Sequence, residues 1–450
     1  MDATTEKLVD YTLATRFEDL PPNVVTACTD RILDTLGCAA GAYDHPVSVA
    51  ARNLAARYAM DTPATILGSG DKTAPEMAAF ANGVMLRVLD MSDTYRVKCG
   101  GHPSDIMAAA FAAAEIAGSD GKALIAAIAA GYEIYCACCE AIDLNSMGWD
   151  QPVYGVIASA MAAGKLMGLT RDQLANTLAL AVVPNMPLYQ TRQGELSAWK
   201  GCAGANAARN GLFAALAAQS GISGPEMPFE GRFGLYDMVG AFDWPLTPGE
   251  PPFRIAHTHI KCFPICYHGQ SAVWAALGLR NDVAVDAIET VEVATYTTAF
   301  KMMANDPTRW APQTRETADH SLPYVVSTAL LQGTVDESSF SDDALHDPAV
   351  GKLMNRISVV EDPALTAQFP GKSPSRITIH LANGENWQNA LDFPKGHAKS
   401  PMTGGEIRDK FKGLFATYGD ARQAGAVIDA VDGLDSAPDL DVLIAAFAES

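Results

Sequence analysis

Residues 244–252 read Trp-Pro-Leu-Thr-Pro-Gly-Glu-Pro-Pro, and this stretch divides the chain into two parts of different character. Its prolines cannot continue a helix, so it predicts an irregular connection. Before it, from residue 5 to about 225, apolar residues recur at helical spacing in one segment after another. After it, one more predicted helix at about 268–280 is followed by alternating patterns that are typical of strands.

The first part is predicted to be an all-helical bundle. Alanine-rich segments such as 108–114 put small side chains on every face of a helix, which allows close packing in a buried bundle. Glycines and capping residues mark the helix ends. The predicted helices cover residues 23–40, 74–90, 105–118, 121–142, 154–169, 171–183 and 203–220.

The second part is predicted to contain a small sheet. Val291-Glu-Val-Ala-Thr and Arg376-Ile-Thr-Ile-His-Leu alternate with a period of two, as strands do. Asn383-Gly384 lies between the second run and residues 387–393 and is a strong hairpin signal. From Thr403 onward the sequence returns to helical patterns.

These patterns predict a mostly α fold with two domains, which is also the expectation for a chain of 450 residues. A large all-helical domain takes residues 1–258 and, after an interruption, residues 396–450. A smaller α+β lid domain, residues 259–395, is inserted into it. A substrate cleft is expected between the two domains.

Composition and charge exclude several classes of function. The net charge of −20 disfavours nucleic acid and anionic membranes as partners, since both require a basic face. The N-terminus has neither a basic nor an apolar leader segment, and the apolar stretch 121–142 contains Lys122, Glu133 and Glu140, which disfavours a membrane span. Nine cysteines without a leader indicate free thiols in a reducing compartment. We therefore expect a cytoplasmic protein.

A loop rich in titratable groups follows the helix predicted at 74–90. It reads Leu89-Asp-Met-Ser-Asp-Thr94 and then Gly101-His-Pro-Ser-Asp105, with Arg96 and Lys98 between the two segments. The glycines and the proline around His102 break any helix there. Such a loop beside apolar helices is a candidate for proton-transfer chemistry. The alternative is a solvated loop in which a serine or aspartate caps the next helix.

Four further segments place reactive groups beside helix breaks. Lys200 in Trp199-Lys-Gly precedes the helix predicted at 203–220, and an ammonium group beside a helix N-terminus suits a carboxylate. Lys261-Cys-Phe-Pro-Ile-Cys-Tyr-His268 lies where the two parts meet. Residues 314–324 contain more polar groups than helix capping needs. Residues 396–401 form a basic loop, for which a plain linker is the alternative interpretation.

Metal and cofactor sites are not favoured by the sequence. Cys136 and Cys139 form a C-x-x-C, but this pair lies inside a helical apolar pattern without a second pair at matching spacing. Small buried core residues are the favoured interpretation of these thiols, with a zinc or iron–sulfur site as the alternative. Phosphate-binding glycine loops and a Gly-x-Ser-x-Gly motif are absent. We therefore expect no metal and no cofactor.

The remaining set of histidines, lysines, an aspartate, a threonine and a tyrosine suits acid–base chemistry on a polycarboxylate. Ammonium groups placed on a carboxylate stabilise the anion that forms when the neighbouring carbon loses a proton. A histidine that accepts or donates the proton adds roughly 10²–10⁴-fold to the rate. The expected partner is therefore a small-molecule polycarboxylate.

Taken together, these motifs resemble the MmgE/PrpD family, which includes 2-methylcitrate dehydratase, cis-aconitate decarboxylase and iminodisuccinate epimerase. The resemblance runs from Leu8 to the loop at 396–398. It implies a large helical domain, a smaller α+β lid, a homodimer and a cofactor-independent site in the cleft. Within the family, the eight-residue spacing from Thr94 to His102 is closer to the dehydratases than to the decarboxylase, whereas Ala318-Asp-His-Ser-Leu-Pro-Tyr324 differs from the methylcitrate dehydratases.

The resemblance also implies roles for individual residues, with a structural polar residue at a domain joint as the alternative for each. His102 would be the main acid or base and Asp90 its orienting neighbour, while the two lysines would hold substrate carboxylates and His268 would be a secondary proton group. The expected catalytic residues are His102, Asp90, Lys200, Lys261 and Tyr324. The expected substrate-binding residues are Thr94, Lys98, His268, Asp150 and Gln151.

One departure from the family concerns the mechanism. Members often have a second catalytic histidine where this chain has Asp150-Gln151. Glutamine cannot exchange a proton at neutral pH, although Asp150 could. The leading hypothesis is a lyase that dehydrates a hydroxy-tricarboxylate such as 2-methylcitrate or citrate. The alternatives are an epimerase of a dicarboxylate, a decarboxylase of the cis-aconitate type, and a binding protein without enzymatic activity.

Overall fold

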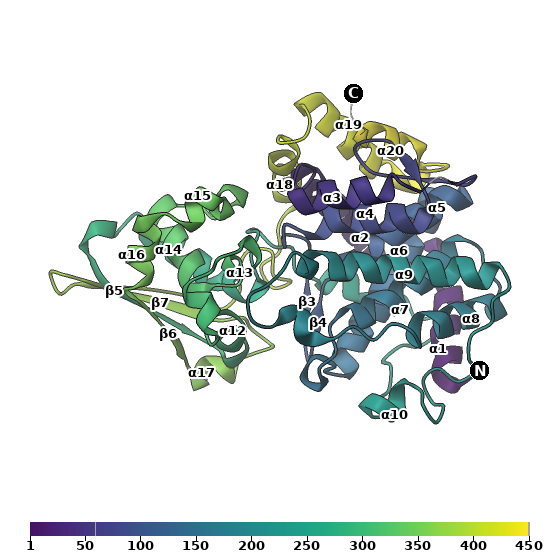
Figure 1. The fold of residues 1–450 in the computed structure, drawn as a ribbon, viewed down its shortest axis with the longest axis horizontal. Coiled ribbons are helices and arrows are strands. Elements are labelled where there is room, and N and C mark those ends of the chain that lie inside the picture. The colour runs from purple at the N-terminus through teal and green to yellow at the C-terminus, as the bar shows by residue number, and fades with distance from the viewer. Residues whose placement is uncertain (59, 449–450) are drawn as a thin grey trace.

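Two separate buried clusters of hydrophobic side chains organise the chain. They correspond to the two parts of the molecule that Figure 1 shows side by side. The computed structural model describes residues 1–58 and 60–448 and is mostly helical, as the sequence predicts. The larger cluster collects side chains from Leu8 to Ile260 and again from Ile407 to Phe447. The smaller cluster collects side chains from Phe263 to Leu381. The C-terminal helices therefore pack on the N-terminal part of the chain, and the segment between them has a core of its own.

The larger part is built from helices whose small residues allow close packing. Alanine-rich α5, α7 and α9 contact one another in its interior, and α18 packs against α2. Its helices are α1 (Ala3–Ala14), α2 (Pro22–Gly41), α3 (Pro46–Ala55), α4 (Pro75–Arg87), α5 (Met107–Ala117), α6 (Gly121–Ala141), α7 (Pro152–Leu166), α8 (Arg171–Val182), α9 (Trp199–Gln219), α10 (Leu235–Val239), α18 (Gly404–Phe415), α19 (Ala421–Asp432) and α20 (Asp441–Phe447).

Helix α9 begins four residues earlier than the sequence predicts, so Lys200 lies in its first turn rather than before it. Gly201 lies within this first turn, and its role is packing. A Cβ atom there would lie 3.2 Å from the Cα of Val88, so the glycine allows α9 to approach the end of α4. This close approach brings Lys200 next to the loop that follows α4.

Helix α6 is the one helix of the described chain that is long and apolar enough to cross a membrane. It lies in the core of the larger part, where 89% of its most apolar 18-residue stretch is buried. Its two glutamates, Glu133 and Glu140, both form ion pairs with Arg254. These pairs explain how two carboxylates are accommodated in an otherwise apolar helix.

The smaller part contains a four-stranded sheet in the order β6-β5-β7-β8 (Figure 1). Strands β5 (Ile288–Thr295) and β7 (Ser375–Leu381) confirm the two predicted runs, and β8 (Asn386–Leu391) completes the predicted hairpin, whose turn contains Gly384 with φ 88°. Strand β6 (Ile357–Glu361) pairs in parallel with β5 and was not predicted. Side chains of β7 alternate between buried and half-buried positions, as the period of two requires.

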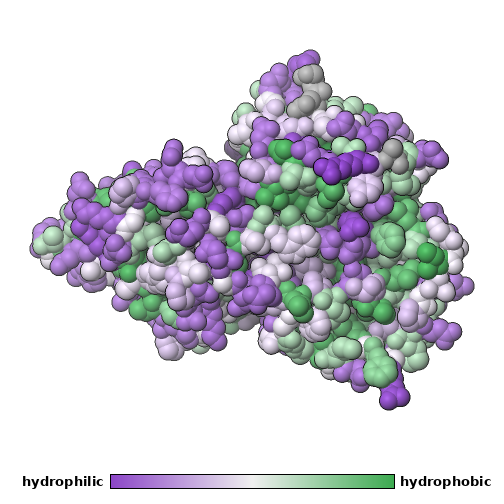
Figure 2. All heavy atoms as spheres, viewed as in Figure 1, coloured by the Kyte–Doolittle hydropathy of each residue, from purple (hydrophilic) through white to green (hydrophobic). Residues whose placement is uncertain are grey.

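Short helices surround this sheet. Helices α11 and α14 pack against each other, and α11 contacts β7 and β8. The helices of this part are α11 (Gln270–Arg280), α12 (Thr297–Met303), α13 (Arg315–Ala318), α14 (Leu322–Gln332), α15 (Asp342–Leu345), α16 (Pro348–Met354) and α17 (Pro363–Thr366). The surface of this part is more hydrophilic in Figure 2 than that of the larger part, which shows several hydrophobic patches.

The chain passes between the two parts at two neighbouring places. The backbone N–H of Ile260 donates to the carbonyl of Gly396 at 3.0 Å, so the outgoing and returning segments are joined by a hydrogen bond. The domain limits near residues 258 and 395, and the role of the smaller part as a lid, remain predictions.

The close packing of α4 against α9 gives a stability prediction. A Cβ atom at Gly83 would lie 2.9 Å from the Cα of Ala205, and backbone cannot move aside easily. We expect Gly83→Ala to destabilise the protein by roughly 1–3 kcal/mol through overpacking. Gly425 in α19 has no atom within 4 Å of such a Cβ, so Gly425→Ala should instead stabilise by up to about 1 kcal/mol. Urea unfolding of both variants measures the difference, and equal effects would contradict this account.

Candidate functional site

The carboxylate of Asp90 is surrounded by three cations. Asp90 follows the end of α4 and is the one non-glycine residue of the described chain with a positive φ, 52°. Aspartate adopts this left-handed conformation more readily than most residues. Its carboxylate pairs with Arg87 Nη1 at 2.8 Å, with Lys200 Nζ at 3.1 Å and with Lys261 Nζ. Burial alone would raise the pKa of Asp90, but these three cations hold it well below its ordinary value.

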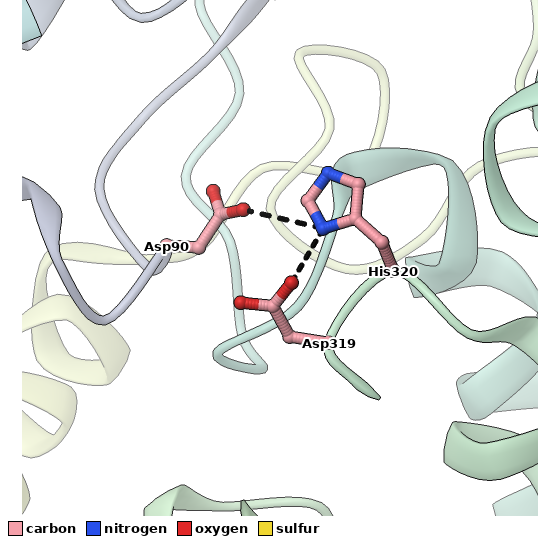
Figure 3. Close-up of side chains that lie close together, drawn as sticks. All are labelled: Asp90, Asp319 and His320. Atoms are coloured by element: carbon pink, nitrogen blue, oxygen red, sulfur yellow. Dashed lines mark hydrogen bonds and ion pairs between the residues drawn. The ribbon is translucent and has the colours of Figure 1, made fainter. Parts of the chain in front are cut away.

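Asp319 binds the same lysine from the smaller part of the molecule. It lies directly after α13, and Lys200 Nζ donates to its two oxygens at 2.6 and 2.7 Å. Arg315 Nη1 donates to it as well, at 3.0 Å. Figure 3 shows Asp90, Asp319 and His320 pointing toward one another. Lys200 therefore connects a carboxylate of the larger part to a carboxylate of the smaller part.

This cluster has the spacing of a metal site but not its free ligand atoms. One ligand atom each from Asp90, Asp319 and His320 lies within 4.8 Å of the others. However, Lys200 already pairs with both carboxylates, which also bind three further cations: Arg87, Lys261 and Arg315. Arg87 and Arg315 pair in turn with Asp105 and Glu337, so the cluster is a closed network of ion pairs. The carboxylate oxygens that a metal ion would need are already engaged by ammonium and guanidinium groups. The donor set therefore does not fit a resident metal ion.

A short hairpin positions His102. Strands β3 (Tyr95–Arg96) and β4 (Gly100–Gly101) pair, and neither was predicted. The backbone N–H of His102 donates to the Tyr135 hydroxyl at 3.0 Å. A Cβ atom at Gly101 would lie 2.0 Å from that same hydroxyl, so only glycine allows this approach. The hairpin is therefore held against α6 with His102 at its end.

His102 is arranged to accept a proton. Its Nδ1 lies 2.8 Å from the carbonyl oxygen of Asp93, and because a carbonyl only accepts, Nδ1 donates. The lone pair of the neutral ring is therefore on Nε2, which lies 4.0 Å from Asp90 Oδ1. Burial, together with Arg87 and Lys261, lowers the pKa of His102 well below its ordinary value. The ring is therefore neutral at neutral pH.

His320 is arranged in the opposite way. Its Nδ1 is hydrogen-bonded to Asp319 and lies 4.0 Å from Asp90 Oδ2. Burial alone would lower the pKa of His320, but the negative charge of Cys266 as a thiolate and that of Asp319 raise it above the ordinary value. The same pocket thus contains one histidine that favours the neutral form and one that favours the charged form.

These groups line a small inner pocket that continues into a larger cavity. The inner pocket has a volume of about 30 Å³ and is lined by Asp90, His102, Lys261 and His320, among others. The larger cavity has a volume of about 700 Å³. The two share the side chains Arg96, Asn145, Tyr189, Arg192, Met302 and His320. Cationic side chains also line the larger cavity, namely Lys98, Lys301 and Arg309.

The structure brings together eight of the ten residues predicted from the sequence. Asp90, His102, Lys261, Asp150 and Gln151 line the inner pocket, and Lys98 and His268 line the larger cavity. Lys200 lies behind the inner pocket, where its ammonium group binds Asp90 and Asp319 instead of facing the cavity. Asp150 binds Arg192 Nε at 3.1 Å and so positions a cation at the mouth of the inner pocket.

Thr94 and Tyr324 are not brought to the pocket. The Thr94 hydroxyl donates to the carbonyl of Gly101 at 2.8 Å, which supports the hairpin that carries His102. The Tyr324 hydroxyl donates to the carbonyl of Ser339 at 2.6 Å, within the core of the smaller part. Both hydroxyls are therefore used inside the protein, and neither side chain lines the inner pocket or the larger cavity.

Sequence reasoning missed several side chains of the site. Asp319 and His320 belong to the polar run at 314–324, whose excess of titratable groups was the available signal. Arg87 is the last residue of α4 and lies three residues before Asp90, close enough in sequence for an ion pair to have been expected. Arg192 lies in a loop without a local pattern, and only the fold brings it to Asp150.

Comparisons with known proteins find similar sequences along most of the chain. A model of the MmgE/PrpD N-terminal domain matches residues 6–245, and a model of the MmgE/PrpD C-terminal domain matches residues 263–435. A 2-methylcitrate dehydratase of Cupriavidus necator is 28% identical, over 95% of this chain and 93% of that protein. The 2-methylcitrate dehydratase of Escherichia coli (strain K12) is 28% identical, over 88% and 87%. A cis-aconitate decarboxylase of Aspergillus terreus is 26% identical, over 95% and 92%.

The burial of Asp90 gives a second stability prediction. Asp90→Asn removes the shared partner of three buried cations, so we expect a loss of roughly 3–5 kcal/mol in the free energy of unfolding. Asp432 pairs with Arg408 at 2.7 Å on the surface, and Asp432→Asn should cost less than about 1 kcal/mol. Denaturant unfolding of the two variants measures both values. A loss at Asp90 no larger than that at Asp432 would show that the cluster does not stabilise the fold.

Proposed function

The chain belongs to the MmgE/PrpD family, and on this premise we propose that it is a cofactor-independent lyase that dehydrates a hydroxy-tricarboxylate. The substrate would be similar to citrate or 2-methylcitrate, because relatives over nearly the full length are 2-methylcitrate dehydratases. Dehydration removes a proton from one carbon and a hydroxyl group from its neighbour. The site must therefore supply a base and an acid.

The observation that carries the proposal is the opposite pKa shift of two histidines on one pocket. The pKa of His102 is lowered by burial and by nearby cations, and the pKa of His320 is raised by Cys266 and Asp319 despite burial. Groups whose pKa values are pushed apart in this way are natural partners in acid–base catalysis. His320 also supplies a second histidine in a chain that has Gln151 in place of one.

In the proposed reaction, Nε2 of His102 accepts the proton from the carbon next to a carboxylate. The electron pair of that C–H bond forms the carbon–carbon double bond, and the C–O bond to the hydroxyl group breaks. His320 donates a proton to the departing hydroxyl, which leaves as water. Both histidines then return to their starting states by proton exchange with solvent.

Cations next to the pocket would bind the substrate carboxylates and stabilise the developing negative charge. Arg96 and Arg192 line both the inner pocket and the larger cavity, and Lys261 lines the inner pocket. An inner pocket of about 30 Å³ is large enough for a water molecule but not for a tricarboxylate. The reacting carbons would therefore lie at its mouth, with the remaining carboxylates in the larger cavity.

The proposal includes a lid role for the smaller part. Asp90, His102 and Lys200 belong to the larger part, whereas His320 and Asp319 belong to the smaller part, and the cavity lies between them. A change in the separation of the two parts would bring the acid toward the base or move it away. Closure over a bound substrate would also exclude water from the developing charge.

The proposal also includes a homodimer. Trp199 and Phe213 on α9 are 48% and 58% exposed, and Leu188, in the segment between α8 and α9, is 63% exposed. Trp199 contributes to a groove of about 260 Å³ that also contains Met186 and Pro187. Exposed large apolar side chains are typical of protein interfaces, so the groove beside Trp199 is the candidate for contact with a second copy.

An epimerase of a dicarboxylate is a second candidate, because a further proton-exchanging group lies beside His102. Burial lowers the pKa of Lys261 to about 8 despite the neighbouring Asp90, so this lysine exchanges its proton readily near neutral pH. One group would remove a proton and the other would return it to the opposite face. Decarboxylation of a cis-aconitate-like acid is a third candidate, since a relative has that activity.

Proton NMR in D₂O distinguishes these reactions. The purified protein is incubated separately with citrate, 2-methylcitrate, cis-aconitate and aspartate-like diacids. We expect a new vinylic signal from a hydroxy-tricarboxylate, because elimination creates a double bond. Deuterium exchange next to a carboxylate without elimination would favour the epimerase. Loss of a carboxylate would favour the decarboxylase, and no change with any of these acids would contradict all three reactions.

Replacing the proposed base tests the mechanism directly. His102→Gln keeps a hydrogen-bonding side chain but cannot take up a proton, so we expect kcat to fall roughly 10²–10⁴-fold. His346 is exposed and lines neither the inner pocket nor the larger cavity. His346→Gln is therefore the matched control and should leave kcat unchanged. Steady-state kinetics measures both variants, with circular dichroism to verify folding. An unchanged rate in His102→Gln would remove this residue from the chemistry.

A further inference from the structure

One cysteine differs from the others in its environment. Burial raises the pKa of the other eight thiols, which contact no charged histidine. Cys266 is also buried, which alone would raise its pKa, but His320 lowers the value to about 7. Asp90 and Lys261 are the other charged groups that act on it, in opposite directions. Cys266 lines the inner pocket beside these residues.

Cys266 belongs to a Cys–His–Asp arrangement. Its thiol and the ring of His320 line the same inner pocket, and Nδ1 of His320 is hydrogen-bonded to Asp319. The backbone N–H of Cys266 donates to the Asp319 carbonyl at 2.9 Å, which fixes the two segments to each other. Lys200 and Arg315 hold the Asp319 carboxylate in turn. A nucleophile, a base and an orienting carboxylate in this order activate a thiol for attack on an electrophile.

The pocket around this thiol also selects the electrophile. Arg96, Arg192 and Lys261 line the same pocket and would bind carboxylates on either side of a reacting carbon. We propose that Cys266 is a nucleophile that adds to the carbon–carbon double bond of an unsaturated dicarboxylate held between these cations. The proposal rests on the proposed function only in that elimination from a hydroxy-tricarboxylate would form the same kind of double bond, in an unsaturated tricarboxylate, at the mouth of this pocket.

The proposed step balances without any further reactant. The thiol proton resides on His320, and the thiolate sulfur of Cys266 attacks one carbon of the double bond. A carbon–sulfur bond forms as the π bond breaks, and the electron pair moves to the neighbouring carbon, where the adjacent carboxylate stabilises it. His320 then donates its proton to that carbon. The product is a thioether that carries the whole diacid.

The adduct would be attached at Cys266 in the inner pocket and would extend through the mouth of that pocket into the larger cavity, past His102 and His320. It would therefore block the proposed elimination, and an accumulating unsaturated product would slowly inactivate the protein that forms it. The reverse reaction needs the same proton to be removed again, so loss of activity and its recovery would both depend on His320.

Intact-protein mass spectrometry after incubation with maleate or fumarate at neutral pH tests the proposal. We expect the mass of one diacid to be added, and peptide mapping to locate it at Cys266. Cys266→Ser should remove the addition. Cys262 is the matched control, because it lies four residues away and is partly exposed, but its Sγ faces the Lys395 carbonyl at 3.4 Å. Cys262→Ser should leave the addition unchanged.

The role of His320 is tested with the uncharged reagent iodoacetamide, which needs no carboxylate-binding site. His320→Gln should slow the alkylation of Cys266 by at least about tenfold, because the thiol returns toward its ordinary pKa and the thiolate fraction falls. An equal alkylation rate in wild type and His320→Gln, or a diacid adduct on Cys262 instead, would overturn the proposal.

The two proposals can fail separately. If the protein eliminates water from a tricarboxylate but forms no adduct at Cys266, the nucleophile proposal is overturned and the lyase proposal stands. If a His320-dependent adduct forms in a protein that turns over none of the tested acids, the nucleophile proposal is supported and the lyase proposal is overturned.

Discussion

The ammonium group of Lys200 is the contact on which the rest of the site depends. It pairs with Asp90 of the larger part at 3.1 Å and with Asp319 of the smaller part at 2.6 Å, and all three side chains are nearly inaccessible to solvent. Buried ions that lose a partner are costly, so each carboxylate is held where the lysine requires it. Asp90 is placed beside His102 and Asp319 beside His320. A single lysine thus connects the carboxylate beside one histidine to the carboxylate beside the other.

The sequence predicts most of the fold because its helices and strands have strong periodic patterns. The helices of the larger part and strands β5, β7 and β8 follow from local pattern alone. The two-residue ladder of β3 and β4 has no local pattern, since the hydroxyl of Tyr135, more than thirty residues away, holds it in place. The start of α9 was misplaced because Gly201 serves packing against another helix, which no single segment of sequence reveals.

The sequence predicts the residues at the centre of the site better than those at its edge. The titratable residues of the loop after α4 and of the segment at 261–268 are brought together, because they are the polar groups left at helix breaks. The hydroxyls of Thr94 and Tyr324 satisfy nearby carbonyls instead, and a sequence does not reveal which partner a hydroxyl will choose. Arg192 reaches the pocket only because Asp150 binds it, which depends on the packing of distant segments.

The surplus of positive charge in the cavity has a consequence for the response of the protein to ionic strength. The protein as a whole is strongly anionic, with a net charge of −20, so its outer field repels a polyanion while the cavity attracts it. Salt screens interactions between exposed charges beyond about 10 Å at 0.1 M but acts much less on buried pairs. Added salt therefore weakens the outer repulsion more than the inner attraction. Capture of a polycarboxylate should become faster as salt rises, opposite to the behaviour of a protein that steers anions with a basic surface.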